Sequence, residues 1–463
     1  MSFFIRNSRG GAPKRKLNGH ISNSMSDARV KKNKRKNFNP KDDESIASSD
    51  EEFAEERAEK EQNFSESSDE DQETAQEKRL RLAKKYLAEI EDEEKDRKEF
   101  EEGAVTKRLH EEYLEEKGRL RKLVAANYTG HTDLLEMRCK DHRDSITCLC
   151  LSSDGRFVYS GSKDGTLVKW SVIDRKKLKV LKGKRKSEEG IKDVRCITIS
   201  TDGKFLVVGD GGAKSIKVLN PEDFQLIKEL QGHRGPVTGL VFRRDTHTLY
   251  SASEDRSVKV WNLDDMAYVE SLFGHQNSVT SIDALSRERA ITSGGYDRTI
   301  RIWKIIEESQ LIYNGHGGSI DVVKLINEEN FLSCGDDGHL SVWGSLKKKP
   351  LCTVPEAHGK DESNGQPMWI SSIATLLNTD LVASAGSRDG VVRLWRCGDS
   401  FKSLTMLFEV KVIGFVNAMA FTPDGENLVV GVGQEHRMGR WWRIPEAKNR
   451  IVIVPLVRNK SNN

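Results

Sequence analysis

One motif recurs between residues 161 and 395: an aspartate is followed six residues later by a tryptophan. The five copies read GSKDGTLVKW (161–170), SASEDRSVKVW (251–261), SGGYDRTIRIW (293–303), SCGDDGHLSVW (333–343) and AGSRDGVVRLW (385–395). Apolar and polar residues alternate after each aspartate, which predicts a turn followed by a β-strand. The tryptophan position recurs every 40–52 residues, at 170, 219, 261, 303, 343, 395 and 441. A unit of this length cannot bury its apolar face alone, so the chain must stack several similar units.

A histidine turn precedes each of these aspartates, at Asp141-His142, Gly232-His233, Gly274-His275, Gly315-His316 and Ala357-His358. Each unit reads as a turn, two strands, an aspartate turn and a further strand, which is typical of one WD40 propeller blade. We predict an all-β fold, a seven-bladed WD40 β-propeller over residues 133–457. In each blade we expect His and Asp to share a hydrogen bond beneath the Trp ring. The residues given this structural role are His142, Asp164, Trp170, His233, Asp255, Trp261, His275, Asp297, Trp303, His316, Asp337, Trp343, His358, Asp389, Trp395 and Trp441.

Two units depart from the pattern. The second lacks the histidine and aspartate and has Leu219 in place of the tryptophan. In the last, GVGQEHRMGRWWRI (431–444), Trp441 continues the series with Glu435 at the aspartate position, so Trp441 is predicted to be the seventh structural tryptophan. Trp442 would then face the opposite side of a strand, toward either a neighbouring blade or a ligand.

The first 132 residues differ in composition, because all eight tryptophans lie from Trp170 onward. Residues 1–41 hold 12 Lys and Arg against one acid, and residues 42–72 hold 14 acids against two bases. This predicts a disordered tail over residues 1–72, basic and then acidic. Nuclear import clusters are predicted at Lys14, Arg15, Lys16, Lys31, Lys32, Lys34, Arg35 and Lys36. Acidophilic phosphorylation is predicted at Ser48, Ser49, Ser67 and Ser68, each with an acid three residues on. A solvated tail and an acidic spacer are the alternatives.

Residues 73–128 have the pattern of charged amphipathic helices. Thr74 and Glu77 have capping-box spacing, and an apolar stripe follows to about residue 102, where Gly103 interrupts the pattern before a second helix. Such narrow stripes should dock on a partner or on the C-terminal domain. Residues 458–463 are predicted to be a disordered tail. Either DLLEMRCK (133–140) or IVIVPLV (451–457) could supply the last outer strand of the ring.

The chain lacks the motifs of several other protein classes. Its seven cysteines contain no CxxC pair, which fits a reducing compartment and no metal site. No GxSxG or HExxH occurs, and GDGGAKS (209–215) lacks the spacing of a phosphate-binding loop, so it is interpreted as a turn. No apolar run approaches the ~18 residues that span a membrane. We predict a non-enzymatic protein without a cofactor, a membrane partner or a small-molecule substrate.

Several stretches outside the repeat motif carry a resemblance. ETAQEKRLRLAKKYL, SRERAITSGG, LLNTDLVAS and GVGQEHR are not required by propeller geometry, and with the repeats they resemble the WD-repeat proteins of the U3 small nucleolar ribonucleoprotein over residues 73–457. The resemblance implies a nucleolar protein that binds the box B/C region of U3 RNA after a kink-turn-binding protein. It also implies association with other box C/D and small-subunit processome proteins during pre-rRNA processing to 18S rRNA.

Basic residues at one rim are candidates for RNA contact. The aspartate turns should place three arginines on the same rim, where guanidinium groups reach phosphates, and a basic cluster precedes the second blade. The candidates are Lys182, Lys184, Arg185, Lys186, Arg256, Arg298, Arg388, Arg437, Arg440 and Trp442. Solvated turn residues are the alternative, and the sequence does not separate loops for RNA from loops for protein. The rival function is a WD40 protein scaffold or substrate adaptor without direct RNA contact.

Overall fold

The computed structural model describes residues 75–95, 104–116, 118–138, 140–183, 190–361, 365–439 and 442–459. Helix α2 spans Ala75–Lys95 and helix α3 spans Ala104–Glu116. Residues 96–103, over which the first predicted helix would end, lie outside the described residues. Gly118 follows α3 with φ +63°, a left-handed conformation that glycine adopts at helix ends. No described helix is long and apolar enough to cross a bilayer.

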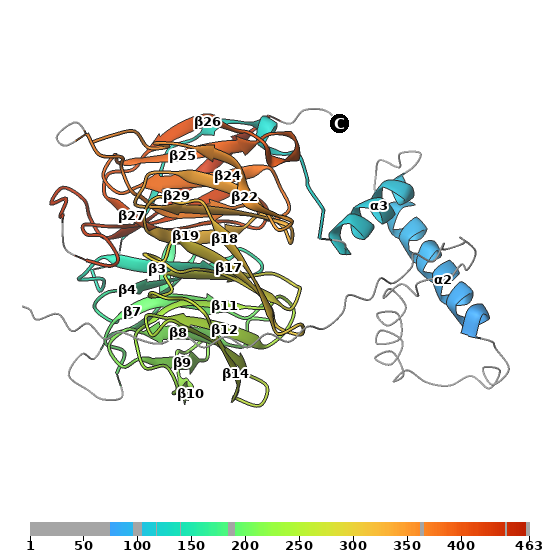
Figure 1. Ribbon diagram of the computed structural model, residues 1–463, viewed down its shortest axis with the longest axis horizontal. Helices are drawn as coiled ribbons and strands as arrows, with labels where there is room; N and C mark the ends of the chain where they lie inside the picture. Colours follow the sequence, from blue (N-terminus) through green and yellow to red (C-terminus); the bar gives the residue numbers. More distant parts are fainter. Residues whose placement is uncertain are drawn as a thin grey trace, which may run out of the picture. The chain divides into compact units, whose positions relative to one another are not determined.

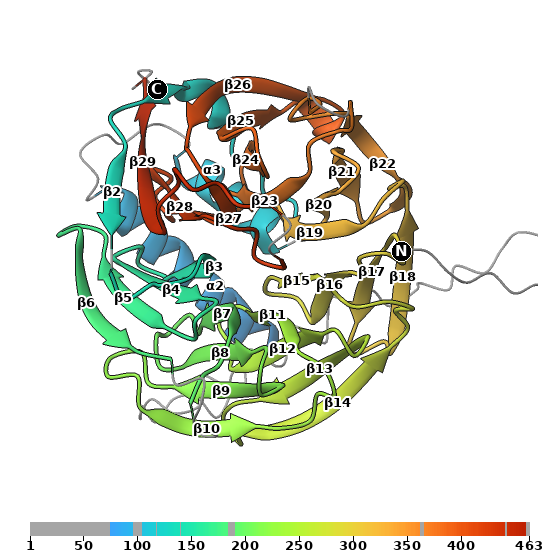
Figure 2. The ribbon, with the colours of Figure 1, turned by 90° about the vertical axis from the view of Figure 1, so that its left-hand side faces the viewer.

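The described residues form seven antiparallel sheets arranged as a ring of blades (Figure 2). Their strands, in chain order, are β3 (Ile146–Leu151), β4 (Phe157–Ser162), β5 (Leu167–Ser171) and β6 (Lys176–Leu181) in blade 1; β7 (Val194–Ile199), β8 (Leu206–Asp210), β9 (Ser215–Leu219) and β10 (Leu226–Leu230) in blade 2; β11 (Val237–Phe242), β12 (Thr248–Ser253), β13 (Ser257–Asn262) and β14 (Ala267–Phe273) in blade 3; and β15 (Ser281–Ala284), β16 (Arg289–Ser293), β17 (Thr299–Lys304) and β18 (Ser309–Asn314) in blade 4.

Three further blades complete the ring. Their strands are β19 (Ile320–Leu325), β20 (Asn330–Gly335), β21 (Leu340–Gly344) and β22 (Lys347–Val354) in blade 5; β23 (Ile370–Thr375), β24 (Leu381–Gly386), β25 (Val391–Cys397) and β26 (Leu404–Lys411) in blade 6; and β27 (Phe415–Phe421), β28 (Asn427–Gly433), β29 (Arg450–Arg458), β1 (Tyr128–His131) and β2 (Leu135–Arg138) in blade 7. The seven-bladed propeller predicted from the repeats is therefore confirmed.

The apolar core lies between adjacent blades. One buried cluster joins Tyr159 of blade 1 to Ile197 and Leu206 of blade 2, and similar clusters follow around the ring. The first strand of each blade lies nearest the axis in Figure 2, and the fourth lies at the outer edge, where β14 has an exposed pattern. The blades thus stack as sheets that each bury both faces, as a propeller requires.

The structure resolves which strand closes the ring. IVIVPLV belongs to β29, the third strand of blade 7, and DLLEMR supplies β2, which pairs with the outer edge of β29. Strand β1 pairs with the far end of the same strand. Met137 of β2, opposite Ile451, is 2% exposed. The start and the end of the propeller sequence therefore share one sheet.

The assignment of Trp441 as the seventh structural tryptophan is wrong. In blade 3, Trp261 pairs with Leu249, and the corresponding pair in blade 7 is Val454 with Leu428. Val454 holds the tryptophan position, and Trp441 itself lies outside the described residues. The long connection over residues 434–449 precedes β29, so Trp442 is not in a strand and the argument from strand alternation does not apply.

The segment before β1 lies along blades 5 and 6. The N–H groups of Val124 and Ala125 donate to Oδ1 of Asp380 at 2.8 and 2.9 Å. Arg121 donates to the carbonyl oxygens of Cys397 and Gly398, both at 2.8 Å. The buried Asp380 carboxylate satisfies the N–H groups at the start of a short 3-10 helix, η2 (Ala125–Asn127). The segment is thereby fixed before it enters the closing strands (Figure 1).

Candidate nucleic-acid interface

A four-residue hydrogen-bond network holds each regular blade. In blade 3, His233 Nδ1 lies 3.0 Å from Asp255 Oδ2, His233 Nε2 lies 2.7 Å from Ser251 Oγ, and Trp261 Nε1 donates to the same Oγ at 2.8 Å. The networks of blades 4, 5 and 6 are His275, Asp297, Thr292 and Trp303; His316, Asp337, Ser333 and Trp343; and His358, Asp389, Ser384 and Trp395. The hydroxyl partner was missed from sequence, although a Ser or Thr lies ten or eleven residues before each tryptophan.

Blade 1 departs from the expected network. His142 Nε2 lies 2.9 Å from Ser160 Oγ, to which Trp170 also donates, but no hydrogen-bond partner among the described residues reaches His142 Nδ1. Asp164 keeps the backbone bond that blades 3, 4 and 5 also have, accepting the N–H of Arg143 at 2.8 Å. The expected bond between His142 and Asp164 is therefore absent. Burial lowers the pKa of His142 to about 4, so the ring is neutral at physiological pH.

Blade 2 replaces the network with one buried carboxylate. Asp210 is 0% exposed, and its Oδ1 accepts the N–H groups of Gly212 and Ala213 at 2.9 and 3.2 Å, while Oδ2 accepts that of Lys192 at 3.1 Å. GDGGAKS thus forms the turn between β8 and β9, as the sequence interpretation stated. An aspartate that caps several N–H groups can hold this turn without histidine or tryptophan.

Two candidate arginines occupy positions that other blades give to glycine. Arg256 has φ +70° and Arg298 has φ +58°, directly after the aspartates of blades 3 and 4, and both are exposed. Gly165, Gly338 and Gly390 hold the same position in blades 1, 5 and 6, also with positive φ. The conformation is set by the aspartate turn and costs about 1–2 kcal/mol for a residue with a Cβ.

The basic loop before blade 2 is described only at its edges. Lys182 is exposed and lies 3.4 Å from Asp141 Oδ1, and the adjacent Gly183 packs against the Asp164 turn. Lys182 therefore lies on the rim of the aspartate turns. Lys184, Arg185 and Lys186 lie outside the described residues.

Arg388 and Trp442 contact each other within the protein. The Arg388 guanidinium lies 3.7 Å from the centroid of the Trp442 ring and 2.8 Å from Asp361 Oδ2. Trp442 also meets Trp369 edge-on, with the ring centroids 5.3 Å apart. Trp442 thus makes a contact with the turns around blade 6 and stays 37% exposed.

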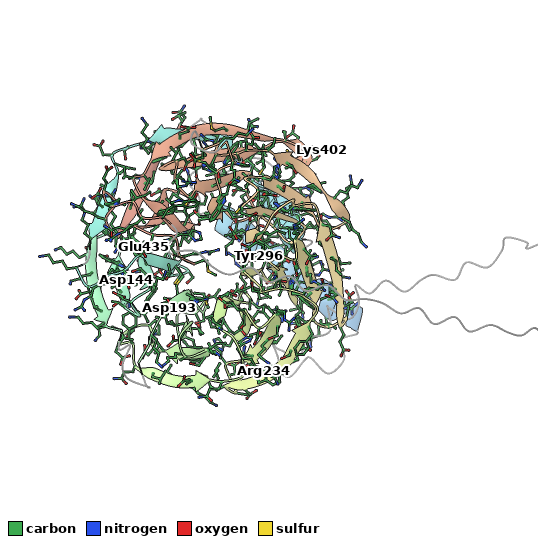
Figure 3. All side chains as sticks on the ribbon, turned by 60° about the vertical axis from the view of Figure 1, so that its left-hand side comes forward. Asp144, Asp193, Arg234, Tyr296, Lys402 and Glu435 are labelled. Atoms are coloured by element: carbon green, nitrogen blue, oxygen red, sulfur yellow. The ribbon has the colours of Figure 1, made fainter. Side chains whose placement is uncertain are left out.

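Arg437 reaches across the central channel instead of the outer rim. Its Nη2 donates to the carbonyl oxygen of Asp321 on the inner strand of blade 5 at 3.1 Å, and its backbone N–H donates to Asn417 Oδ1 at 2.9 Å. Figure 3 shows Glu435, Asp144 and Asp193 near one side of the central opening and Tyr296 near the other. Arg440 lies outside the described residues, as do the import clusters at 14–16 and 31–36 and the serines at 48, 49, 67 and 68.

The ring of seven blades and the His, Asp, Ser and Trp networks define a WD-repeat propeller. Five segments match the WD40 family (WD domain, G-beta repeat), at residues 134–171, 224–262, 267–304, 307–344 and 358–396. The human protein "U3 small nucleolar RNA-interacting protein 2" is 52% identical, with 84% of this chain and 83% of the human protein covered. The chain belongs to the family of that protein.

A yeast relative and a solved structure are also similar to this chain. "Ribosomal RNA-processing protein 9" of Saccharomyces cerevisiae is 25% identical, with 62% of this chain and 64% of the yeast protein covered. A solved structure titled "Crystal structure of RRP9 WD40 repeats" is 49% identical, has a TM-score of 0.68 and covers 71% of this chain and 99% of that one.

Proposed function

We propose that the protein is a non-catalytic RNA- and protein-binding subunit of the U3 small nucleolar ribonucleoprotein and acts in ribosome biogenesis. The names of the human and yeast relatives support a role with U3 RNA and in rRNA processing. At the finer level, we propose that it binds the box B/C region of U3 RNA together with a kink-turn-binding protein. It would act with other box C/D and small-subunit processome proteins in processing to 18S rRNA.

The observation that supports RNA contact is a pair of exposed arginines at turn positions that glycine occupies in other blades. Arg256 and Arg298 hold a left-handed conformation that the fold itself satisfies with glycine in three other blades. Propeller geometry gives no reason for a strained arginine there, whereas a guanidinium can bind a phosphate with two hydrogen bonds. Lys182 extends the same rim toward the basic loop. Arg388 and Arg437 are engaged within the protein and are weaker candidates.

The charge of the chain limits how tightly this rim could bind alone. The formal net charge is only +3, and a few phosphate contacts give weak, salt-sensitive binding. Binding to an RNA already held by a kink-turn protein would lower the cost of association, because the RNA is ordered beforehand. Bulged or unpaired nucleotides are the usual targets of such rims.

The first experiment crosslinks RNA to the protein in cells, followed by immunoprecipitation and sequencing of the attached RNA. We expect U3 RNA with crosslinks at one internal stem. The double variant Arg256→Gly, Arg298→Gly should reduce crosslinking, and in vitro it should lower the slope of log K against log salt by about one per lost phosphate contact. Asp245→Asn, a surface change in another loop, is the control. Abundant protein partners without RNA above background would favour the scaffold function.

A nuclear and nucleolar location is part of the proposal. The basic clusters at 14–16 and 31–36 are proposed to bind import receptors, and the serines at 48, 49, 67 and 68 to accept phosphate. Replacing the eight basic residues of these clusters by glutamine should leave a fluorescent fusion in the cytoplasm. Nucleolar fluorescence of that variant would show that these clusters are not the import signal.

A further inference from the structure

A cavity of about 450 Å³ opens beside the central channel. Tyr296, Trp369 and Trp442 supply aromatic rings to its wall, and Asp321 and Asp336 supply carboxyl groups. The remaining lining includes Arg437 and the hydroxyl groups of Ser278, Thr280 and Ser319. The volume falls within the range of sites that enclose a small ligand or a single side chain.

The aromatic wall is packed against other side chains on one side and exposed on the other. Trp369 and Trp442 meet edge-on at 5.3 Å, and Arg388 lies against the Trp442 ring at 3.7 Å. Tyr296, in the turn after β16, is 71% exposed. No described residue stacks on the Tyr296 ring, so its face is available to a flat or cationic group.

Arg437 acts on Asp321 and Arg298 acts on Asp336, but these cations match the two carboxyl groups only in part. Oδ1 of Asp336 is enclosed in the protein and has no donor among the described residues, so a ligand in the cavity can meet only Oδ2 of this carboxyl group. Burial raises the pKa of Asp321 to about 7, with Asp336 and Asp337 acting in the same direction, although Arg437 and a hydrogen bond from Ser319 lower it. Burial also raises the pKa of Asp336, against Arg298 and His316. The cations present in the structure therefore do not offset the burial of these two groups.

We propose that this cavity, which adjoins the proposed RNA rim at Arg298, binds the arginine side chain of a protein partner. A guanidinium carries five N–H donors in one plane, so it can meet two carboxylates and the neighbouring hydroxyl groups together. Its flat face can stack on Tyr296, as Arg388 stacks on Trp442. A phosphate would be repelled by these carboxyl groups when they are ionised, and an apolar group would give no donor to the carboxyl groups that line the cavity.

The test titrates the full-length protein, labelled with 5-fluorotryptophan, with short capped peptides while the fluorine signal of Trp442 is recorded. The peptides are Gly-Ser-Gly-Arg-Gly-Ser-Gly and the same sequence with citrulline, which keeps the shape of arginine but lacks its charge. The Trp442 signal is assigned with the Trp442→Phe variant. We expect saturable shifts with the arginine peptide at millimolar concentration and none with the citrulline peptide.

Variants identify the groups that bind. Asp321→Asn and Asp336→Asn should each weaken binding roughly tenfold, as expected when one charge-assisted pair is removed. Tyr296→Ala, at an exposed position, should weaken it without affecting folding, and it keeps the test valid if an aspartate variant is unstable. Asp245→Asn is the matched control, because it makes the same change at an exposed turn with φ +56°, which Asn tolerates. Its affinity should equal that of the wild type.

Binding should also tighten between about pH 6 and about pH 8, as the Asp321 carboxyl ionises. Equal shifts with arginine and citrulline, or no shift with either, would overturn the proposal. Guanosine monophosphate is titrated in parallel, because its base also presents neighbouring N–H donors and a flat face. Saturable binding of the nucleotide without binding of the arginine peptide would mean that the cavity binds a nucleobase and not an arginine side chain.

Discussion

At the scale of single residues, the hydroxyl groups beneath the tryptophans should contribute strongly to the stability of the blades. The hydroxyl group of Ser251 lies 2.7 Å from His233 Nε2 and accepts the hydrogen bond of Trp261 Nε1, while His233 Nδ1 lies 3.0 Å from Asp255 Oδ2. Ser251→Ala leaves two buried groups unpaired and should lower the free energy of unfolding by about 2–4 kcal/mol. Urea denaturation measures this loss.

The control for that prediction is Ser309→Ala, an exposed serine in the outer strand β18, which should change the free energy by less than about 0.5 kcal/mol. Equal stability of the two variants would show that water replaces the missing hydroxyl in blade 3.

The contribution of Asp321 to the stability of the folded protein should depend on pH. Because burial raises its pKa to about 7, the folded protein holds a proton that the unfolded chain has already lost at intermediate pH. Stability from this group therefore falls as pH rises from about 4 to about 7 and is then constant. Asp321→Asn removes this dependence, so the variant should gain stability relative to the wild type over that range. Denaturation curves at about pH 5 and about pH 8 measure the difference, and a constant difference would contradict the prediction.

At the scale of elements, His247 joins the turns of two blades. Its Nε2 lies 2.9 Å from Asp202 Oδ2, in the turn between β7 and β8, and its Nδ1 bonds to Asp264 after β13. Asp264 and Asp202 raise the pKa of His247. A raised histidine pKa adds stability that is complete below the unfolded value of about 6.5 and is lost as pH rises through the folded value.

His247→Gln should therefore destabilise the protein more at about pH 6 than at about pH 9, and the difference should shrink in high salt because the site is partly exposed. Thermal denaturation at the two pH values provides the measurement. His131→Gln, at an exposed histidine in β1 for which no carboxylate partner is found among the described residues, is the control. A loss that does not vary with pH would mean that His247 acts by packing on Phe205 alone.

The elements also show how far the sequence predicts this structure. Strands and turns of the regular blades follow from the aspartate and tryptophan spacing, because each repeat must present the same apolar faces. The seventh blade could not be placed that way. Trp441 lies 46 residues after Trp395, within the observed range of the repeat, while Val454 at the true position looks like any strand valine. The cavity was also missed, since its residues come from blades 4, 5, 6 and 7 and share no local pattern.

At the scale of the whole molecule, the ring depends on a strand from before the first blade. Strands β1 and β2 cover the outer edge of β29, which would otherwise present unpaired N–H and C=O groups. Tyr128 adds a hydrogen bond to the Gly425 carbonyl oxygen at 2.8 Å and accepts one from Arg458 at 2.7 Å. These contacts lie within blade 7, and because the chain continues from β2 into β3 they tie blade 7 to blade 1.

Truncation tests this dependence. A chain that starts at residue 118 retains both closing strands and the segment bound to Asp380, so it should fold as a monomer and unfold in one transition. A chain that starts at residue 140 loses the burial of Met137 and the hydrogen bonds of two strands, a loss on the order of 5 kcal/mol, which is comparable with the whole stability of many domains. We expect that chain to aggregate through the open edge of β29. Calorimetry with light scattering measures both outcomes, and a monomeric, cooperatively unfolding chain from residue 140 would mean that the ring stays closed without β1 and β2.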